Sequence, residues 1–361
     1  MSGDATGGVS PPGGAPDADG MWAVTAGLAA QVADGAAVAG SVEGLPSAAG
    51  LTSIIALGMG GSGIGNDVVA AIAAPTCALP IMVGRDYELP AFVGPATLVF
   101  AASFSGNTEE TLSAASAAVE RGARLVAVTG GGALAALASS VGAPVVPIPR
   151  DIPHPRAAIG AMTVAPLVVL ARLGLLPDVP AMIDAAVAQL SARRDVLLAE
   201  GSSSLAATVA RRIGRTIPLF YGGGPLGRAA AMRWKGQVNE NPKAPAFWAA
   251  HPELCHNELT GWGQNGDVTR QLITLVDLRH DFEHPQVARR FGLVDEIMDE
   301  VVAAVVTVRA AGDGPLAQLF DLVLIGDFVA LWLAAQEGVD PGPIPVLGAL
   351  KDALAVGAGD R

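Results

Sequence analysis

Short apolar runs alternate with longer stretches rich in alanine and leucine through the first 150 residues. The apolar runs are residues 53–57 (SIIAL), 97–101 (TLVFA), 124–128 (RLVAV) and 144–148 (PVVPI). Continuous runs of this length, rich in Val, Ile and Leu, are typical of buried parallel strands. Between them, residues 66–74 and 109–121 have the apolar spacing of helices. The alternation of strand and helix predicts a doubly wound α/β sheet.

The second half of the chain repeats this pattern. A long helical stretch covers residues 157–199 with a break near Pro177 and Pro180, and further strands are predicted at residues 218–221, 271–276 and 301–309. A helix over residues 319–336 and a tail over residues 338–354 close the chain. We therefore predict two domains of the same α/β class, residues 21–190 and 191–361, with their boundary between 180 and 200.

The length and net charge of the chain exclude some classes of function. A chain of 361 residues has room for two domains. Its net charge is −12, from 34 acidic and 22 basic residues, and it has no run of Lys or Arg, which argues against a nucleic-acid-binding protein. An anionic ligand must then be attracted by local donors. No uninterrupted apolar run approaches about 18 residues, so the sequence does not indicate a membrane protein.

The N-terminus and the cysteines indicate the compartment. Residues 1–20 are rich in Gly, Pro, Ala and Asp and lack a positively charged or apolar leader segment, so we predict a disordered tail and not a signal peptide. Cys77 and Cys255 have neither metal-ligand nor disulfide-framework spacing. Unpaired cysteines favour a reducing compartment, and we predict a cytoplasmic protein.

A glycine-rich segment, GMGGSGIGND at residues 58–67, follows the first predicted strand and opens a helix. Glycines allow a ligand to approach the backbone, and free amides at a helix start favour an anion. Gly58, Gly60 and Gly63 also have the spacing of a dinucleotide-binding turn, but residues 85–88 match the acidic ribose partner poorly. A plain tight turn is the remaining alternative.

A second loop, SFSGNTEET at residues 103–111, again lies between a strand and a helix. Ser103, Ser105 and Thr108 offer hydroxyls beside main-chain amides, which suits a phosphate group. Helix capping by Thr108 is the alternative. Two such loops after neighbouring strands meet at the carboxyl edge of one sheet, where ligands of these folds bind.

The two loops together resemble the sugar isomerase (SIS) domain, a flavodoxin-like unit that binds phosphosugars. HPRAAIG at 154–160, WKGQVNENPKAPAF at 234–247 and PELCHNELTGW at 252–262 extend the resemblance to the bifunctional phosphoglucose/phosphomannose isomerases of archaea and some bacteria. The resemblance runs from about residue 50 to Lys351. It implies two SIS domains, a metal- and cofactor-independent isomerase of hexose 6-phosphates, and a homodimer whose active site is completed by a histidine of the partner chain.

The resemblance also implies roles for individual residues. It assigns phosphate binding to Gly61, Ser62, Ser103, Ser105 and Thr108, and catalysis to Arg156, Glu240, His256 and Lys351. Within this second group, Arg156 lies beside the reacting carbons, Glu240 is the base, His256 opens the sugar ring and Lys351 is the C-terminal lysine. Three positions depart from the family pattern: His154 replaces Gln, Cys255 replaces Asn and Gly342 replaces Thr. The missing threonine is expected to affect how the two C2 epimers, glucose and mannose 6-phosphate, are accommodated.

The residue types fit this chemistry. Aldose–ketose isomerisation needs an acid/base pair that opens the ring, a base that moves a proton from C2 to C1, and a cation that stabilises the enediolate. Glu240 stands in a polar turn before Pro242, and Glu258 is expected to orient His256. His280 and His284 are expected on a solvated charged face. Ordinary surface positions remain the alternative for Arg156 and Lys351.

Two other classes of function are open at this point. A catalytically silent phosphosugar-binding sensor would keep the serine and threonine loops but dispense with Glu240, His256 and Lys351. A nucleotide-binding oxidoreductase would leave the loop at 103–111 without a role.

Overall fold

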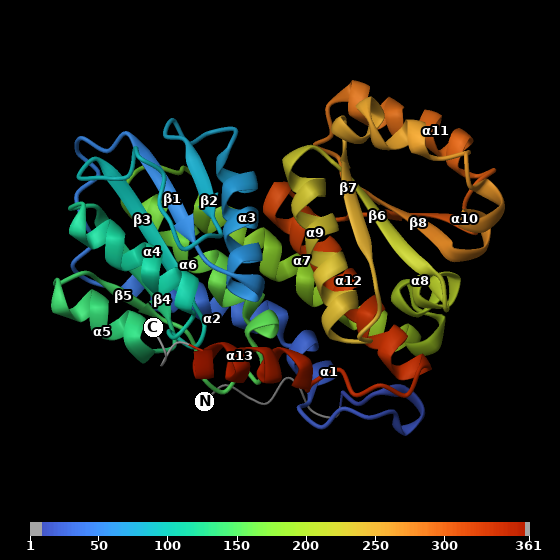
Figure 1. The fold of residues 1–361 in the computed structure, drawn as a ribbon, viewed down its shortest axis with the longest axis horizontal. Helices are drawn as coiled ribbons and strands as arrows, with labels where there is room; N and C mark the ends of the chain where they lie inside the picture. The colour runs from blue at the N-terminus through green and yellow to red at the C-terminus, as the bar shows by residue number, and fades with distance from the viewer. Residues whose placement is uncertain (1–8, 358–361) are drawn as a thin grey trace.

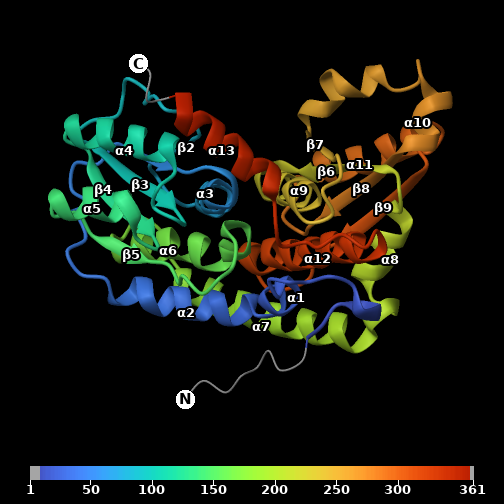
Figure 2. The same ribbon diagram turned by 60° about the horizontal axis from the view of Figure 1, so that its bottom comes forward.

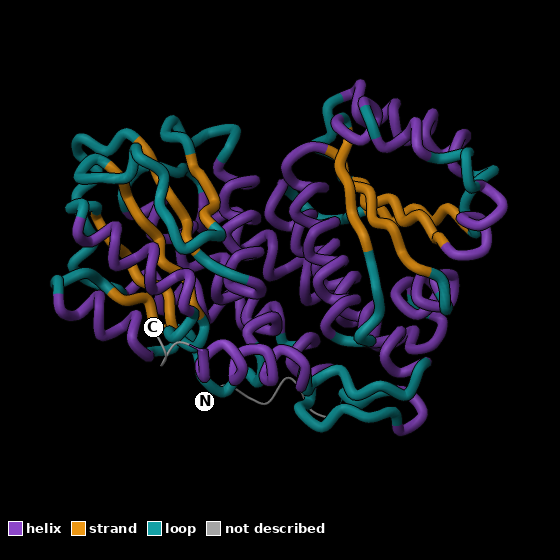
Figure 3. Tube along the Cα trace, viewed as in Figure 1, coloured by secondary structure: helices purple, strands orange, loops and turns teal. Residues whose placement is uncertain are grey.

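The computed structural model describes residues 9–357, which form two parallel β-sheets side by side (Figure 1). The first sheet has the strand order β2-β1-β3-β4-β5 and the second has the order β7-β6-β8-β9. The first order is that of flavodoxin-like folds, and the second is the same order without a fifth strand. Helices lie between the two sheets and on their outer sides (Figure 3). The predicted fold class, two doubly wound α/β units, is confirmed.

The N-terminal half contains the first sheet and its helices. The strands are β1 (Ser53–Leu57), β2 (Ile81–Gly84), β3 (Thr97–Ser103), β4 (Arg124–Thr129) and β5 (Val145–Pro147). The helices are η1 (Pro12–Gly14), α1 (Met21–Ala26), α2 (Leu28–Ser41), α3 (Gly60–Ala73), α4 (Glu109–Glu120), α5 (Gly132–Ser140), η2 (Pro155–Ala158), α6 (Ile159–Arg172) and α7 (Val179–Glu200). Strands β1 and β3 are buried along their whole length, which is why they appear in the sequence as unbroken apolar runs.

The C-terminal half contains the second sheet. Its strands are β6 (Ile217–Gly223), β7 (Phe247–His251), β8 (Ile273–Arg279) and β9 (Ala304–Arg309). Its helices are η3 (Gly201–Ser203), α8 (Leu205–Ile213), α9 (Gly224–Glu240), η4 (Glu253–His256), η5 (Glu258–Gly261), α10 (Gly266–Leu272), α11 (Pro285–Met298), α12 (Pro315–Gln336) and α13 (Pro345–Gly357).

The two halves use the same glycine device after their first central strand. In the turn from β1 to α3, a Cβ on Gly63 would lie 2.7 Å from the carbonyl oxygen of Gly58. In the turn from β6 to α9, a Cβ on Gly222 would lie 2.0 Å from the carbonyl oxygen of Gly227. Each pair is five residues apart, and each lets a strand end and a helix start touch backbone to backbone. This repetition supports an internal duplication.

One apolar cluster runs through both halves and centres on α12. This helix packs against α7, α8 and α9, and its residues are almost all buried. By length and composition, α12 and the stretch Pro155–Arg172 are apolar enough to cross a membrane. Most of both segments is covered by the protein itself, so they serve here as core helices.

Residues 9–20 make defined contacts, although their composition led us to expect a tail without structure. The Asp17 carboxylate accepts hydrogen bonds from the backbone N–H of Met21 at 2.7 Å and of Trp22 at 3.2 Å, so it caps the start of α1. The N–H of Ala18 donates to the Asp340 carboxylate near the other end of the chain. The part of that prediction that concerns residues 1–8 lies outside the described residues.

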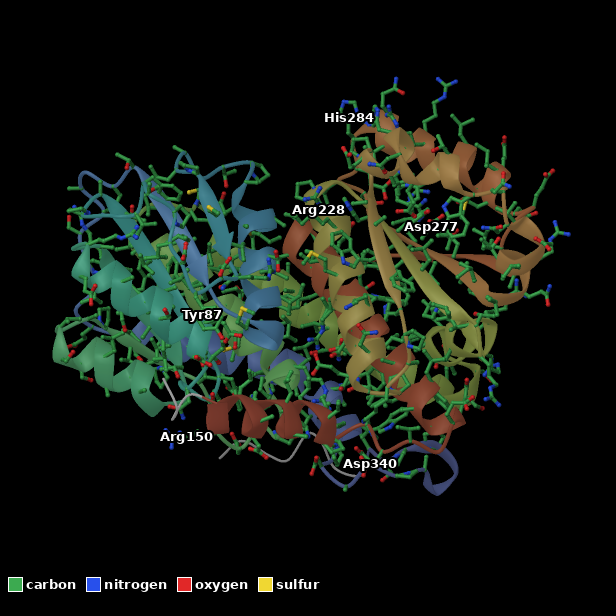
Figure 4. The ribbon with its side chains drawn as sticks, viewed as in Figure 1. Tyr87, Arg150, Arg228, Asp277, His284 and Asp340 are labelled. Atoms are coloured by element: carbon green, nitrogen blue, oxygen red, sulfur yellow. The ribbon has the colours of Figure 1, made fainter. Side chains whose placement is uncertain are left out.

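A pair of carboxyl groups lies inside the second half. Asp277 of β8 is fully buried, and Figure 4 shows it within the second sheet. Burial, and after it the neighbouring Asp295 carboxyl, raise the pKa of the Asp277 carboxyl well above its usual range. Because the native state then holds a proton that the unfolded chain releases, the resulting stability is complete below the unfolded pKa of about 3.9. It is lost as pH rises through the native pKa.

We therefore predict that Asp277→Asn flattens the pH dependence of stability. Asparagine keeps the shape of the protonated acid but never ionises, so the variant should have a Tm a few degrees above that of the wild type on the alkaline side and a smaller difference in acid. Thermal unfolding across pH 5–9 measures this. Asp299→Asn, at the exposed end of α11, is the control and should follow the wild-type curve. Parallel curves for all three proteins would contradict the prediction.

Candidate active site

The two sequence loops meet at the carboxyl edge of the first sheet. Ser62, in the first turn of α3, accepts a hydrogen bond at its Oγ from the backbone N–H of Phe104 at 3.2 Å. The starts of α3 and α4 both lie at this edge, and each offers unpaired backbone amides and the positive end of a helix dipole. The arrangement suits a phosphate group.

Hydroxyl groups gather inside the second loop. Ser103 Oγ lies 2.8 Å from Thr108 Oγ1 and accepts from the N–H of Gly106 at 3.1 Å, while Ser105 Oγ accepts from the N–H of Asn107 at 3.2 Å. Gly106 has a φ of 72°, and a Cβ there would lie only 1.7 Å from the carbonyl oxygen of Gly131. Glycine is therefore required for this loop to close. Thr108 precedes α4 without a side-chain capping bond, so capping does not account for its hydroxyl.

Arg156 connects this edge to the C-terminal half. Its backbone lies against Gly61, where a Cβ would approach the N of Arg156 to 2.7 Å. Its side chain is 2% exposed, and burial lowers the pKa of the guanidinium while the Glu240 carboxylate opposes that shift. Arg156 Nη1 lies 3.7 Å from Glu240 Oε2. A buried cation and a carboxylate thus stand together beside the glycine loop.

Glu240 is the last residue of α9, where the sequence had suggested a polar turn. It lines a cleft of about 290 Å³ between α3 and α9, together with Gly60, Gly61, Arg85 and Lys235. This volume is at the small end of the range for ligand pockets. Glu240 is 31% exposed, so its carboxylate reaches the cleft.

The cleft also contains a cation that the sequence analysis missed. Arg233 of α9 lines it and is 3% exposed, and its guanidinium makes a bidentate ion pair with Asp327 of α12 at 2.7 and 2.9 Å. Burial raises the pKa of Asp327, and Arg233 opposes that shift. The sequence signal was a pair of aspartates, Asp321 and Asp327, inside a mostly apolar helix, which is unusual unless the charges are paired.

His256 lies at the opposite end of α9 from Glu240. It belongs to η4, directly after β7, and β7 pairs Gly223 with His251 just before α9 begins at Gly224. Because α9 has 17 residues and a helix rises about 1.5 Å per residue, the two ends are about 25 Å apart. Figure 4 shows the separation through Arg228, near the first end, and Asp340, beyond the second. One chain therefore does not bring His256 to Glu240.

The loop that carries His256 is held by a hydrogen bond between Glu258 and Tyr221 of β6. Glu258, expected to orient His256, instead accepts a hydrogen bond from the hydroxyl of Tyr221 at 2.5 Å. His256 itself is exposed. His280, expected on a solvated face, is 3% exposed and its Nε2 lies 2.9 Å from the carbonyl oxygen of Gly223, so that expectation was wrong. Burial lowers the pKa of His251 to about 4, so this histidine is neutral at pH 7.

Lys351 is on the exposed helix α13, and no contact among the described residues joins it to Glu240 or Arg156. Figure 2 shows α13 crossing in front of the first sheet, near α3 and α4. Its apolar residues Val346, Leu347, Leu350 and Leu354 are all exposed. The helix is attached through residues 340–342, since Pro341 and Gly342 accept hydrogen bonds from Arg156.

Two of the three departures from the family pattern lie next to each other. His154 Nε2 is 2.7 Å from Asp19 Oδ2, and a Cβ on Gly342 would come within 2.3 Å of that same oxygen. Glycine at 342 therefore makes room for Asp19. The third, Cys255, lies apart, with its Sγ 3.5 Å from His251 Nδ1.

Comparison with known proteins gives relatives over most of the chain. Residues 202–354 match the family described as bacterial phospho-glucose isomerase C-terminal SIS domain. A bifunctional phosphoglucose/phosphomannose isomerase from Caldicellulosiruptor bescii is 36% identical over 307 residues, which cover 84% of this chain and 90% of the relative. A protein of the same name from Aquifex aeolicus is 33% identical over 302 residues, covering 83% of this chain and 90% of the relative.

Solved structures share the fold at much lower identity. The C-terminal domain of glucosamine-fructose-6-phosphate aminotransferase from Francisella tularensis superposes with a TM-score of 0.68 at 12% identity, covering 90% of this chain and 97% of that one. At this identity the similarity concerns the arrangement of the two α/β units alone.

Proposed function

The chain belongs to the family of bifunctional phosphoglucose/phosphomannose isomerases, and from this premise we propose that it interconverts fructose 6-phosphate with glucose 6-phosphate and mannose 6-phosphate. The observation that carries the proposal is the buried Arg156 guanidinium, 3.7 Å from the Glu240 carboxylate in a cleft beside the glycine loop. A base next to a fixed cation is the minimum that an enediolate intermediate requires.

The phosphate group of the substrate binds, in this proposal, at the carboxyl edge of the first sheet. Ser62, Ser103, Ser105 and Thr108 present hydroxyls there, Gly61 leaves the backbone accessible, and two helix starts supply amides. These local donors offset the net charge of −12, which by itself would repel a phosphosugar.

The proton transfer uses the other end of the cleft. Glu240 takes the proton from C2 of the open-chain aldose as the C2–H electron pair forms the enediolate double bond and the C1 carbonyl oxygen becomes negative. Arg156 Nη1 stabilises that oxygen. Glu240 then returns the proton to C1 while the proton of the C2 hydroxyl passes to the negative C1 oxygen, so that C1 becomes the alcohol and C2 the ketose carbonyl. Return to the opposite face of C2 would yield the other aldose epimer.

Ring opening needs a second acid/base group, and we propose that a second copy of the chain supplies it. His256 is exposed and about 25 Å from Glu240 along α9. A two-fold dimer brings the same surface of each copy to the other, so each His256 would serve the cleft of its partner. The exposed apolar residues of α13 are consistent with a further surface covered on assembly. Lys351, on that helix, would complete the site.

A cytoplasmic location follows from the same proposal. Both cysteines, Cys77 and Cys255, are free and half-buried, as expected for a protein in a reducing compartment.

The test is incubation of the purified protein with fructose 6-phosphate in the presence of EDTA, with both aldoses followed by coupled assays or NMR. Formation of glucose 6-phosphate and mannose 6-phosphate is expected. Glucose 6-phosphate alone would restrict the activity and direct attention to Gly342 and Asp19. Binding of phosphosugar without any product would support the sensor hypothesis and contradict the proposal.

A further inference from the structure

Asn241, the residue after the proposed base, contacts Arg156 in a way that the reaction chemistry described so far does not use. Its side chain is 1% exposed, and its Oδ1 accepts a hydrogen bond from Arg156 Nε at 2.9 Å. Its Nδ2 is buried without a hydrogen-bond partner among the described residues. A buried amide nitrogen without a hydrogen-bond partner lowers the stability of the fold, so its presence calls for an explanation.

The guanidinium of Arg156 has few free donors left. Nε donates to Asn241, and Nη2 donates to the carbonyl oxygens of Pro341 at 2.5 Å and Gly342 at 2.7 Å. Only Nη1 makes no hydrogen bond within residues 9–357, and it is this nitrogen that faces Glu240 at 3.7 Å. The guanidinium is planar and presents its five N–H groups in a rigid fork. The three fixed acceptors of Nε and Nη2 therefore determine where Nη1 points.

We propose that Asn241 is a positioning residue for the isomerase reaction, which holds the Arg156 guanidinium so that its Nη1 edge faces the carbon atoms served by Glu240. The inference rests on the proposed function. The two carbonyl acceptors hold Nη2, whereas Asn241 holds Nε, so Asn241 is the side chain that completes the restraint on the orientation of the group.

The position of Asn241 in the chain makes this coupling direct. Its own N–H donates to the carbonyl oxygen of Gln237 and ends α9 immediately after Glu240. Base and guanidinium are therefore held by neighbouring residues of one helix end. A change at position 241 is expected to move the cation relative to the base without substituting either of them.

The experiment is a double-mutant cycle with fructose 6-phosphate as substrate. Asn241→Ala removes the acceptor, and we expect kcat to fall about 10- to 100-fold, in line with the loss of a hydrogen bond to a charged group. The KM for fructose 6-phosphate should change less than about three-fold, because the phosphate loops are untouched. In an Arg156→Ala background, the same substitution should change kcat less than about two-fold, since the group that Asn241 positions is gone.

Asn241→Ser is the rescue variant, because its hydroxyl can still accept from Nε through a water molecule or directly, and it should recover part of kcat. Equal losses from Asn241→Ala in both backgrounds would overturn the proposal and indicate a purely structural role. Full turnover by Arg156→Ala alone would instead contradict the role of Arg156 in the proposed function. Circular dichroism melting of each variant separates both results from unfolding.

Discussion

Glu240→Gln should lower kcat for fructose 6-phosphate by about 100- to 10,000-fold, the usual contribution of a general base, while KM stays within a few-fold. Glutamine has nearly the same shape but cannot accept the C2 proton. The substitution is at the end of α9 and the side chain is 31% exposed, so the fold should tolerate it. Arg156 keeps its three hydrogen-bond acceptors in the variant.

Steady-state kinetics in both directions, together with a direct binding measurement for fructose 6-phosphate, would check this. Glu337→Gln is the matched control: it is another glutamate at the end of a long helix, α12, and it is exposed. It should retain wild-type kcat. If Glu240→Gln also kept full turnover, another carboxylate would have to be the base.

The clearest strand predictions are the strands buried on both faces, although the partly exposed edge strands β5 and β9 were also predicted. Residues of β1 and β3 are buried throughout, so their apolar runs are unbroken. The two strands that it missed, β2 and β7, are the edges of their sheets and are partly exposed. An edge strand needs no continuous apolar run, and the sequence pattern therefore gives little sign of it.

Strand β8 illustrates a boundary that periodicity misplaces. Residues 271 and 272 looked like the start of the strand, but they close α10, and the strand begins at Ile273. A short helix and a short strand that share apolar residues cannot be separated by pattern alone. Contact with β6 and β9 decides the boundary, and those partners are far away in the sequence.

The site could be predicted only where its chemistry is local. The serine and threonine loops are continuous segments whose glycines and hydroxyls indicate an anion. The surroundings of Arg156 are assembled from residues 156, 240, 241, 341 and 342, and two of its acceptors are backbone carbonyls, which have no side-chain signature. The pairing of Arg233 with Asp327 likewise depends on the packing of α9 against α12.

The separation of Glu240 and His256 predicts that two inactive variants restore activity when they share a dimer. Glu240→Gln and His256→Ala should each have little activity as homodimers. In a mixed dimer, one cleft carries both substitutions, whereas the other combines the intact Glu240 of one chain with the intact His256 of its partner. Purified mixed dimers should thus have about half the wild-type activity, and randomly paired chains about one quarter.

Co-expression of the two variants with different affinity tags, followed by two purification steps, isolates the mixed dimers for this measurement.

The control mixes Glu240→Gln with Arg156→Ala, because these two residues lie 3.7 Å apart in one chain. Each cleft of their mixed dimers carries one of the two substitutions, so these dimers should stay as inactive as the homodimers. The informative contrast is His256→Ala with Arg156→Ala, which behaves like the first pair only if His256 acts across the dimer. If His256 instead served the cleft of its own chain after a rearrangement, each cleft in both His256 mixtures would carry one of the two substitutions. No activity would then return. Because about 25 Å of helix separates His256 from Glu240, such a rearrangement would have to break the packing of η4 on β7 and the hydrogen bond between Tyr221 and Glu258 of the adjoining η5. Activity from the His256 mixtures therefore requires the partner chain.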